Sequence, residues 1–381
     1  MNARLPVPSH DVRSVTLFMA AILLAFVVQI PEVIVAGTAL CGVYAYAARS
    51  RAGLTHEQLL GGVLVSLLFL PAFVKPYHGL SPTFYFIATL LAFAAATVVS
   101  KKSPVVLLTS FRCVFWASAV AIATILYFYW DDPAPFGRVI EGSSTNGIPS
   151  YLIVVQVGLS LAHYLVHRRL PVVSPLFTAT VAFFGSGRGS LVVAALLLAG
   201  TLLLNLLPAG EVGGRRWRRY YSIAVLLVLI AVAADGEEIY ELISTYTKLS
   251  AGLLDTNRLE IWEQYRDKID AFHFLFGADY RGTIIETEYN NNPHISYIRT
   301  HSFFGLPITA LAMVSPLIIL LGMKKLFSAR LVFLYFIGLA ALRAYSEPIF
   351  FPTILDFFYF TYFLIFFNHA PEQKARRERI R

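Results

Sequence analysis

The stretch LVVAALLLAGTLLLNLL, residues 191–207, contains no charged side chain. As an α-helix it is long enough to cross the roughly 30 Å hydrocarbon core of a bilayer. Residues 14–30 are also free of charge, and residues 105–129 carry a single arginine. One such run could be a buried helix of a soluble protein, but about a dozen occur along this chain. The sequence therefore predicts an all-α polytopic membrane protein.

The composition of the whole chain supports this class. Of its 381 residues, 57% are hydrophobic and 14% are charged, whereas soluble domains carry roughly 25% charged residues. The recurrence of apolar runs predicts about 12 transmembrane helices. The expected spans lie near residues 14–30, 33–48, 58–74, 82–99, 105–129, 150–166, 171–185, 190–207, 220–235, 303–322, 330–343 and 352–368.

The charges between these spans predict which loops are cytoplasmic, because Lys and Arg concentrate on the cytoplasmic side. Most basic residues fall on one side, and most acids on the other. The basic side holds Arg4, Arg13, Arg49, Arg51, Lys101, Lys102, Arg168, Arg169, Arg215, Arg216, Arg218, Arg219, Lys324, Lys325, Arg330 and the tail from Lys374 to Arg381. Both termini are therefore expected to be cytoplasmic. The net charge of +8 suits anionic lipid of the inner leaflet and needs no nucleic-acid partner.

This topology divides the chain into three parts. Residues 1–235 form transmembrane helices 1–9, and residues 303–381 form helices 10–12 and a basic cytoplasmic tail. Between them, residues 236–302 form one large external loop, periplasmic in a bacterium, with a mixed polar pattern that can fold. A membrane protein with so long an external loop is expected to use it, and we predict a catalytic loop.

A glycine-rich hexapeptide, GSGRGS at 185–190, joins two expected spans on the external side. Gly187 and Gly189 let the backbone turn tightly and approach a ligand. The loop leads into a helix N-terminus, whose free N–H groups favour an anion, and Arg188 adds a permanent charge with bidentate geometry. The alternative is a tight turn with one solvated arginine.

A helix is expected inside the external loop, from Arg258 to about Ala271. Asn257 is a plausible N-cap, with Glu260 at the reciprocal capping position. Spacing by four places three side chains on one face of this helix, a face suited to a phosphate or a sugar. They are Arg258, Trp262 and Arg266. The alternative is an ordinary amphipathic surface helix.

Further candidates lie near the last spans. His294 is in a polar stretch just outside the expected bilayer, where a neutral imidazole could act as general base. The alternative is a surface histidine, and His301 is its rival in the sequence. Arg343 and Glu347 flank another external turn and could pair or line one cavity. Asp356 lies inside the last expected span without an assigned role.

Taken in order, these motifs resemble the O-antigen ligase and polymerase superfamily, which includes WaaL-type ligases and Wzy-type polysaccharide polymerases. The family often has Ser-Arg-Gly and Pro-His-Asn, where this chain has Gly187 and Ile295; the second departure weakens the case for a ligase. The matching residues are Gly187-Arg188-Gly189, Asn257-Arg258 with Trp262, Phe276-Gly277, Pro293-His294-x-x-Tyr297 and Gly305-Leu306-Pro307.

The resemblance implies a membrane-embedded, GT-C-like glycosyltransferase of the bacterial inner membrane. Its donor is a glycan on a polyprenyl diphosphate, flipped to the outer face. A polymerase moves the growing chain onto the next lipid-linked repeat, whereas a ligase moves it onto a lipid A core. A flippase and a chain-length regulator are implied as further partners, beside the lipid bilayer.

The residues are compatible with this chemistry without a metal or a cofactor. Arg188 and Arg258 could stabilise the departing diphosphate by preorganised electrostatics, and His294 is the candidate base for the acceptor hydroxyl. These three residues are expected to face one another at the membrane surface. Further substrate contacts are expected from Gly187, Gly189, Trp262, Arg266, Tyr297, Arg299, His301 and Arg343. A transporter of lipid-linked sugars and a purely structural membrane partner remain as alternatives of other classes.

Overall fold

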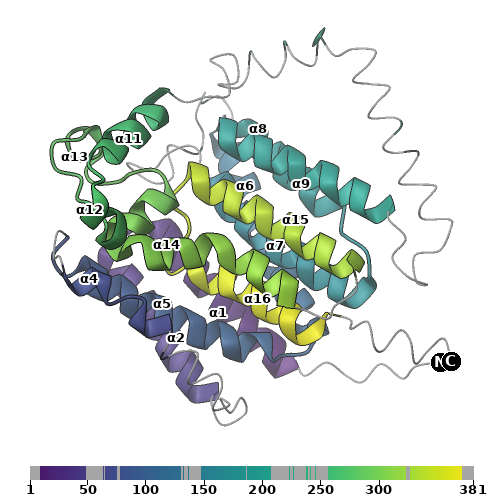
Figure 1. Ribbon diagram of the computed structural model, residues 1–381. Coiled ribbons are helices and arrows are strands. Elements are labelled where there is room, and N and C mark those ends of the chain that lie inside the picture. Colours follow the sequence, from purple (N-terminus) through teal and green to yellow (C-terminus); the bar gives the residue numbers. More distant parts are fainter. Residues whose placement is uncertain are drawn as a thin grey trace.

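The computed structural model is a bundle of helices with a small helical unit at one end (Figure 1). It describes residues 9–48, 63, 65–74, 78–129, 132, 136, 147–185, 187–206, 223, 226, 237, 238, 241, 245, 256–322 and 327–370. Within these residues every regular element is a helix. In chain order they are α1 (Ser9–Val28), α2 (Pro31–Ala48), α4 (Pro71–Val74), α5 (Ser81–Ser100), α6 (Pro104–Phe128), α7 (Gly147–His167), α8 (Val173–Phe184), α9 (Arg188–Leu206), α11 (Thr256–Asp267), α12 (Ala271–Phe276), α13 (Ile284–Thr287), α14 (Ser296–Gly322), α15 (Phe327–Ser346) and α16 (Asp356–His369).

Seven of the described helices are long and apolar enough to cross a membrane: α1, α2, α5, α6, α7, α9 and α15. The all-helical fold predicted from the apolar runs is therefore confirmed for the described residues, and these helices are consistent with a multi-pass membrane protein. Helix α8 is shorter, and α14 and α16 coincide with the expected spans 303–322 and 352–368. Of the expected span 58–74, residues 63 and 65–74 are described, and a turn at 68–70 precedes the short helix α4, so this part is not one continuous helix. The expected span 220–235 lies largely outside the described residues. A total of 12 spans and a GT-C-like arrangement stay predictions.

Contacts between distant helices show that successive helices alternate in direction. At one end of the bundle, Lys102 Nζ lies 2.8 Å from Asp11 Oδ1, and Asn368 Nδ2 donates to Ser100 Oγ at 3.1 Å. The start of α1, the end of α5 and the end of α16 therefore lie together. The charge pattern predicts this same grouping, on the cytoplasmic side.

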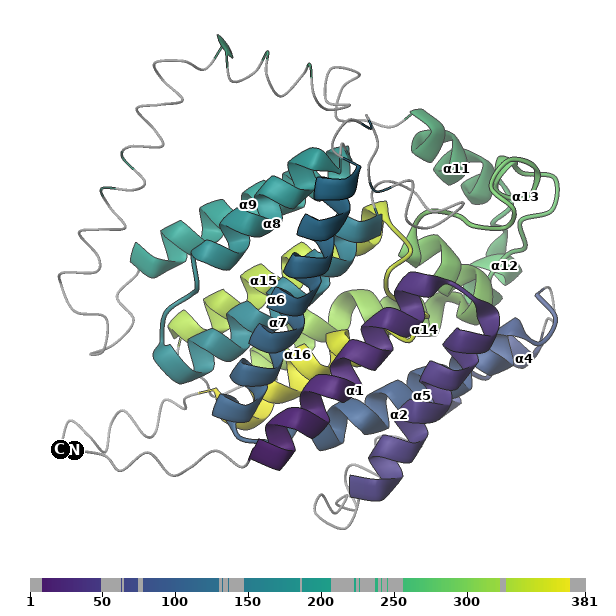
Figure 2. The ribbon, with the colours of Figure 1, turned by 180° about the vertical axis from the view of Figure 1, so that it is seen from behind.

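The other end of the bundle joins the opposite helix termini. Gln29, just after α1, donates from Nε2 to the Tyr151 hydroxyl at 3.1 Å, and Arg343 near the end of α15 reaches Ser150 near the start of α7. Helix α7 runs through the middle of the bundle, and 94% of the residues in its apolar 18-residue stretch are buried. Helices α1 and α2 cover the back of the bundle (Figure 2).

We call residues 256–302, the described part of the loop expected to be external, the external unit; it packs around a small core of its own. Ile261 and Tyr265 of α11 meet Tyr280, Ile285 of α13 and Ile298 of α14 there. Because Ile298 belongs to the first turns of α14, the same core fixes the external unit to the bundle. The external unit is labelled at the upper left of Figure 1, where α11, α12 and α13 lie beside α14.

Two corrections apply to the helix expected from Arg258 to Ala271. Helix α11 begins at Thr256 and ends at Asp267, and α12 starts afresh at Ala271. Asn257 therefore lies inside α11, and its side chain donates to the Tyr289 hydroxyl at 2.9 Å instead of capping the helix. The chain restarts because Asp270 accepts a hydrogen bond from the His273 backbone N–H at 2.7 Å, which caps α12.

Helix α12 ends where it crosses a break in α14, and two glycines make this crossing possible. Gly277 has φ 87° and Gly305 has φ 69°, values that favour glycine. A Cβ on Gly277 would lie 2.2 Å from the His301 carbonyl oxygen, and one on Gly305 would lie 2.1 Å from that of Leu275. The two sequence motifs Phe276-Gly277 and Gly305-Leu306-Pro307 therefore meet in one close backbone contact.

A tight turn between α15 and α16 closes the same end of the bundle. Asp356 is 1% exposed and accepts from the backbone N–H groups of Phe351 (2.8 Å) and Thr353 (3.1 Å). The Thr300 hydroxyl donates to the Phe351 carbonyl at 2.6 Å. Asp356, which had no assigned role, therefore stabilises this turn, and Thr300 joins the turn to the start of α14.

Candidate functional site

Arg343 is the deepest charge of the candidate site. Its position near the C-terminus of α15 leaves it only 1% exposed. Its Nε and Nη2 donate to the Ser150 hydroxyl at 3.1 and 2.5 Å, and its Nη1 donates to the Ser346 hydroxyl at 2.5 Å. A buried guanidinium requires such partners, because burying an unsatisfied charge is costly. The serines therefore fix Arg343 between α7 and α15.

Glu347 joins this buried arginine to the external loop. Its Oε1 lies 3.4 Å from Arg343 Nη2 and 3.6 Å from Arg258 Nη2. Arg258 comes from α11, so one carboxylate bridges the transmembrane bundle and the external unit. The pairing of Arg343 with Glu347 is one of the two arrangements expected from their spacing.

The glycine-rich turn places the start of α9 against the same arginine. Helix α9 begins at Arg188, and the Leu191 N–H donates to the Gly187 carbonyl at 3.0 Å. A Cβ on Gly189 would lie 3.1 Å from Arg343 Nη1 and 2.9 Å from the Ser346 hydroxyl. A larger residue would have to displace these side chains, and glycine avoids this. The N-terminal turn of α9, with Arg188 half-buried in it, therefore adds its partial positive charge beside Arg343.

His294 stands on a strained loop beside the first turn of α11. Its φ is 52°, and its backbone N–H donates to Asn292 Oδ1 at 3.1 Å. Its ring packs edge-on against Tyr289, with centroids 5.0 Å apart. The Tyr289 hydroxyl accepts from Asn257 at 2.9 Å, and Asn257 precedes Arg258. Tyr289 thus links the candidate base to the loop arginine.

The start of α14 connects the His294 loop to the backbone of Glu347. Ser296, two residues after His294, donates from its hydroxyl to the Glu347 carbonyl at 2.9 Å. The described contacts therefore gather four expected residues at one end of the bundle. They are Arg188, Arg258, His294 and Arg343.

Three other expected residues lie around this group. Trp262 stacks on Tyr345 of α15, with ring centroids 6.1 Å apart and planes 23° apart, so α11 rests on α15. The Tyr297 hydroxyl donates to the Ala341 carbonyl at 3.0 Å, which is a packing contact. Arg266 is exposed and lies 3.3 Å from Asp267, also exposed, so it is not brought into the group.

Arg299 and His301 hold backbone together. Arg299 donates from Nη2 to the Pro348 carbonyl at 2.6 Å. His301 lies with Nε2 2.9 Å from the Phe274 carbonyl, to which it donates, and Nδ1 accepts from the Tyr265 hydroxyl at 2.8 Å. Both ring nitrogens of His301 are occupied by the protein, so His301 is poorly suited to take a proton from a substrate.

The sequence did not point to Ser150, Ser346, Tyr289 and Tyr345. The first two are the hydrogen-bond acceptors of Arg343, and the other two support His294 and Trp262. A signal existed for the serines alone, because each stands at the external end of an expected span where a buried arginine needs partners.

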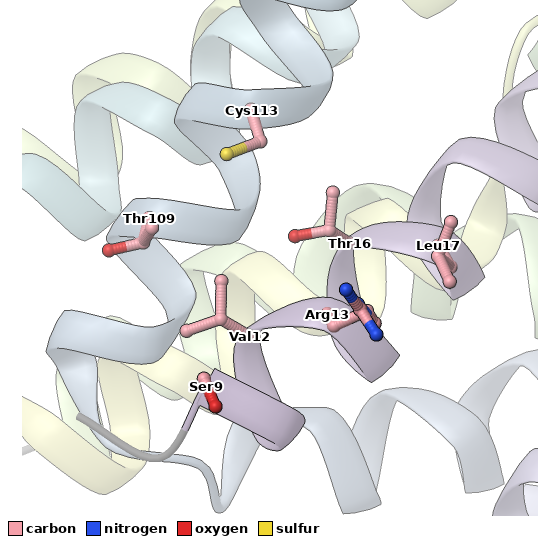
Figure 3. Close-up of a pocket in the computed structure, with 7 residues that line it drawn as sticks. All are labelled: Ser9, Val12, Arg13, Thr16, Leu17, Thr109 and Cys113. Atoms are coloured by element: carbon pink, nitrogen blue, oxygen red, sulfur yellow. The ribbon is translucent and has the colours of Figure 1, made fainter.

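A hollow between α1 and α6 is shown in Figure 3. It is lined by the first turns of α1, which belong to the end of the bundle opposite to this group. It is open and largely apolar, which is typical of a surface between transmembrane helices. Its lining residues are Ser9, Val12, Arg13, Thr16, Leu17, Thr109 and Cys113. Among the residues that the structure describes, no group of three or more His, Cys, Asp or Glu side chains is arranged to hold a metal ion.

Comparison with known proteins gave no match to a family model, to a curated protein or to a solved structure. The function of the site is therefore inferred from its own residues and their contacts.

Proposed function

We propose that this protein is a Wzy-type polymerase, which joins polyprenyl-diphosphate-linked oligosaccharide repeats into a surface polysaccharide by inverting, metal-independent glycosyl transfer. One observation carries the proposal. Arg258 of the external unit and Arg343 of the bundle converge on a single carboxylate, at 3.6 and 3.4 Å, beside the N-terminal turn of α9. Such a cluster of positive charge at the membrane surface suits a lipid diphosphate.

The arginines would act on the leaving group. As the bond between the anomeric carbon and the phosphate oxygen breaks, negative charge develops on the diphosphate. Guanidinium groups bind phosphate oxygens bidentately, and preorganised donors lower the barrier most where charge develops. Arg343 is already fixed by two serines, whereas Arg258 and Arg188 sit on elements that flank it.

His294 would act on the acceptor. A hydroxyl of the incoming repeat attacks the anomeric carbon and loses its proton to the neutral imidazole. The bonding electrons leave with the diphosphate, so one displacement inverts the anomeric configuration. The ring of His294 is positioned by Tyr289, on the side of the group that faces the external unit.

The position of the group suits substrates that stay in the membrane. It lies where the external unit meets the ends of α7, α9 and α15, and two of these helices carry the most buried and the most apolar candidate spans. A carrier lipid could remain in the bilayer while its diphosphate reaches the arginines. We place this end at the periplasmic face of a bacterial inner membrane, supplied by a flippase.

The test is the surface polysaccharide made by a strain whose own copy of the gene is replaced by a variant. Arg188→Ala, Arg258→Ala and His294→Ala are each expected to abolish long chains on a gel. Arg266→Ala is the matched control, because its guanidinium is exposed and paired with the adjacent Asp267. Wild-type chain lengths from the Arg258 and His294 variants, with normal amounts of protein in the membrane, would contradict the proposal.

The same gel separates a polymerase from a WaaL-type ligase, which would use the same donor. Loss of a polymerase leaves single repeats attached to lipid A core. Loss of a ligase leaves long chains unattached on the carrier lipid.

A transporter of lipid-linked sugars is the second candidate, favoured by the break in α14 at Gly305 (φ 69°, ψ −170°). Interrupted transmembrane helices often form substrate sites in transporters. Purified protein in vesicles distinguishes the two functions. A transporter moves the lipid-linked repeat between leaflets and leaves its length unchanged, whereas a polymerase lengthens the glycan.

A further inference from the structure

The carboxylate of Glu347 has the same kind of contact that a phosphate group would make. It is 7% exposed, and one of its oxygens lies between the guanidiniums of Arg258 and Arg343. Charge-assisted hydrogen bonds from arginine to an anion are normally about 2.7–2.9 Å long. The separations of 3.6 and 3.4 Å are longer, so both are loose ion pairs rather than short hydrogen bonds.

Neither arginine depends on Glu347 alone for its placement. Arg343 keeps its hydrogen bonds to Ser150 and Ser346, and Arg258 is carried by α11, whose Trp262 stacks on Tyr345. The backbone of Glu347 is held separately, by the Ser296 hydroxyl at 2.9 Å. The side chain of Glu347 can therefore turn away without dismantling the site.

The charges also favour replacement of the Glu347 carboxylate by a diphosphate at the two arginines. Two guanidiniums and one carboxylate leave a net positive charge in a mostly buried place, and a diphosphate carries more negative charge than a carboxylate. Both anions would use the same donors, so they cannot be bound fully at once. A competitor inside the protein weakens binding of the substrate and of the diphosphate product equally, and so speeds product release.

We propose that Glu347 is a positioning residue that competes with the diphosphate for Arg258 and Arg343, an inference that rests on the proposed function. In this role Glu347 holds the two arginines in register before an anion arrives. It then limits how tightly the spent carrier diphosphate is retained.

Binding of inorganic pyrophosphate to the full chain in detergent, measured by calorimetry, tests the inference. Glu347→Gln keeps the shape of the side chain and removes its charge, and it is expected to tighten pyrophosphate binding roughly ten-fold, in line with coupling energies of close charge pairs. Glu288→Gln is the matched control, since Glu288 is exposed on the external unit and its charge change should leave the affinity unchanged.

A second variant covers the case in which Glu347→Gln does not fold. Glu347→Asp keeps the charge on a shorter side chain that reaches the arginines less well. The affinity of this variant for pyrophosphate is therefore expected to rise by a smaller factor than that of Glu347→Gln. A merely structural glutamate predicts unchanged or weaker binding in both variants, and that result overturns the inference alone. Failure of pyrophosphate to bind the wild-type protein overturns the proposed anion site, and the inference with it.

Discussion

Two arginines at the same end of the bundle are buried in different ways. Arg343 is satisfied by side chains, the hydroxyls of Ser150 and Ser346 and the carboxylate of Glu347. Arg299 is held by backbone: its Nη2 donates to the carbonyls of Pro348 and Phe350, while its buried Nε has no hydrogen-bond partner among the described residues. Side chains can turn toward a ligand, whereas carbonyls of a tight turn cannot. We call the contacts around Arg343 the side-chain cluster and those around Arg299 the backbone cluster. The side-chain cluster can exchange partners, whereas the backbone cluster can only stabilise the fold.

The two histidines repeat this contrast. His301 belongs to the backbone cluster, because both of its ring nitrogens are occupied by Tyr265 and Phe274. The ring of His294 packs against Tyr289 at the edge of the side-chain cluster. We expect substitutions in the side-chain cluster to lower activity and substitutions in the backbone cluster to lower stability.

The largest effect is expected from Arg258→Ala. Removing one preorganised donor from a developing negative charge costs about 100-fold or more in rate. Because Glu347 keeps its contact with Arg343 and Trp262 still stacks on Tyr345, the melting temperature should change little. Chain elongation by the purified protein and its thermal unfolding in detergent measure the two quantities. A large drop in melting temperature would show that Arg258 mainly stabilises the fold, as the backbone cluster does.

A large loss of stability is expected from Arg299→Ala, with elongation per folded molecule retained. The substitution strands the Pro348 and Phe350 carbonyls, and each buried unsatisfied polar group costs about 1–3 kcal/mol. Thermal unfolding in detergent and the amount of folded protein in the membrane measure the loss. A stable Arg299→Ala protein without activity would move Arg299 into the site and break the comparison.

A smaller effect on stability separates the two histidines. His301→Asn loses the bridge between Tyr265 and Phe274, at a cost of about 1–2 kcal/mol, and its melting temperature should fall. His294→Asn should leave it unchanged, because asparagine tolerates the left-handed φ of 52° at that position, yet elongation should stop. The opposite pattern, an active His294→Asn protein, would remove His294 as the base.

The sequence predicted those features that depend on one segment at a time. Apolar runs predicted the apolar helices, charges predicted their alternation, and the positions of Arg343 and Glu347 around one expected turn predicted that they could pair or line one cavity. Even so, the helix expected at 258–271 divides into α11 and α12, because Asp270 caps a new helix. Capping by Asn257 looked equally plausible from sequence, and its true partner, Tyr289, is distant along the chain.

Contacts between segments could not be predicted in this way. The break in α14 at Gly305 exists because the Leu275 carbonyl approaches it, and the sequence shows only a glycine before a proline. The sequence also gave no partner for Arg299, since its acceptors lie on a turn near α16. The approach of Gly189 to Arg343 depends on how α9 packs on α15.

The smallest expected effect concerns His78, which ties the turn before α5 to the backbone cluster. Its Nε2 donates to the Ser302 hydroxyl at 2.7 Å, and Ser302 donates to the Ala278 carbonyl at 2.5 Å. Burial lowers the pKa of His78 to about 4, with Asp279 opposing the shift. In the unfolded chain a histidine has a pKa of about 6.5.

Between these two values the unfolded state binds more protons than the folded state, so the stability from His78 is complete above about pH 6.5 and is lost toward pH 4. His78→Gln can keep a donor to Ser302 and should flatten this part of the profile. Melting temperatures of both proteins in detergent from pH 7 to pH 4 measure the difference. Parallel profiles would show that folding does not lower the pKa of His78, and its hydrogen bond to Ser302 would then contribute no pH-dependent stability between pH 7 and pH 4.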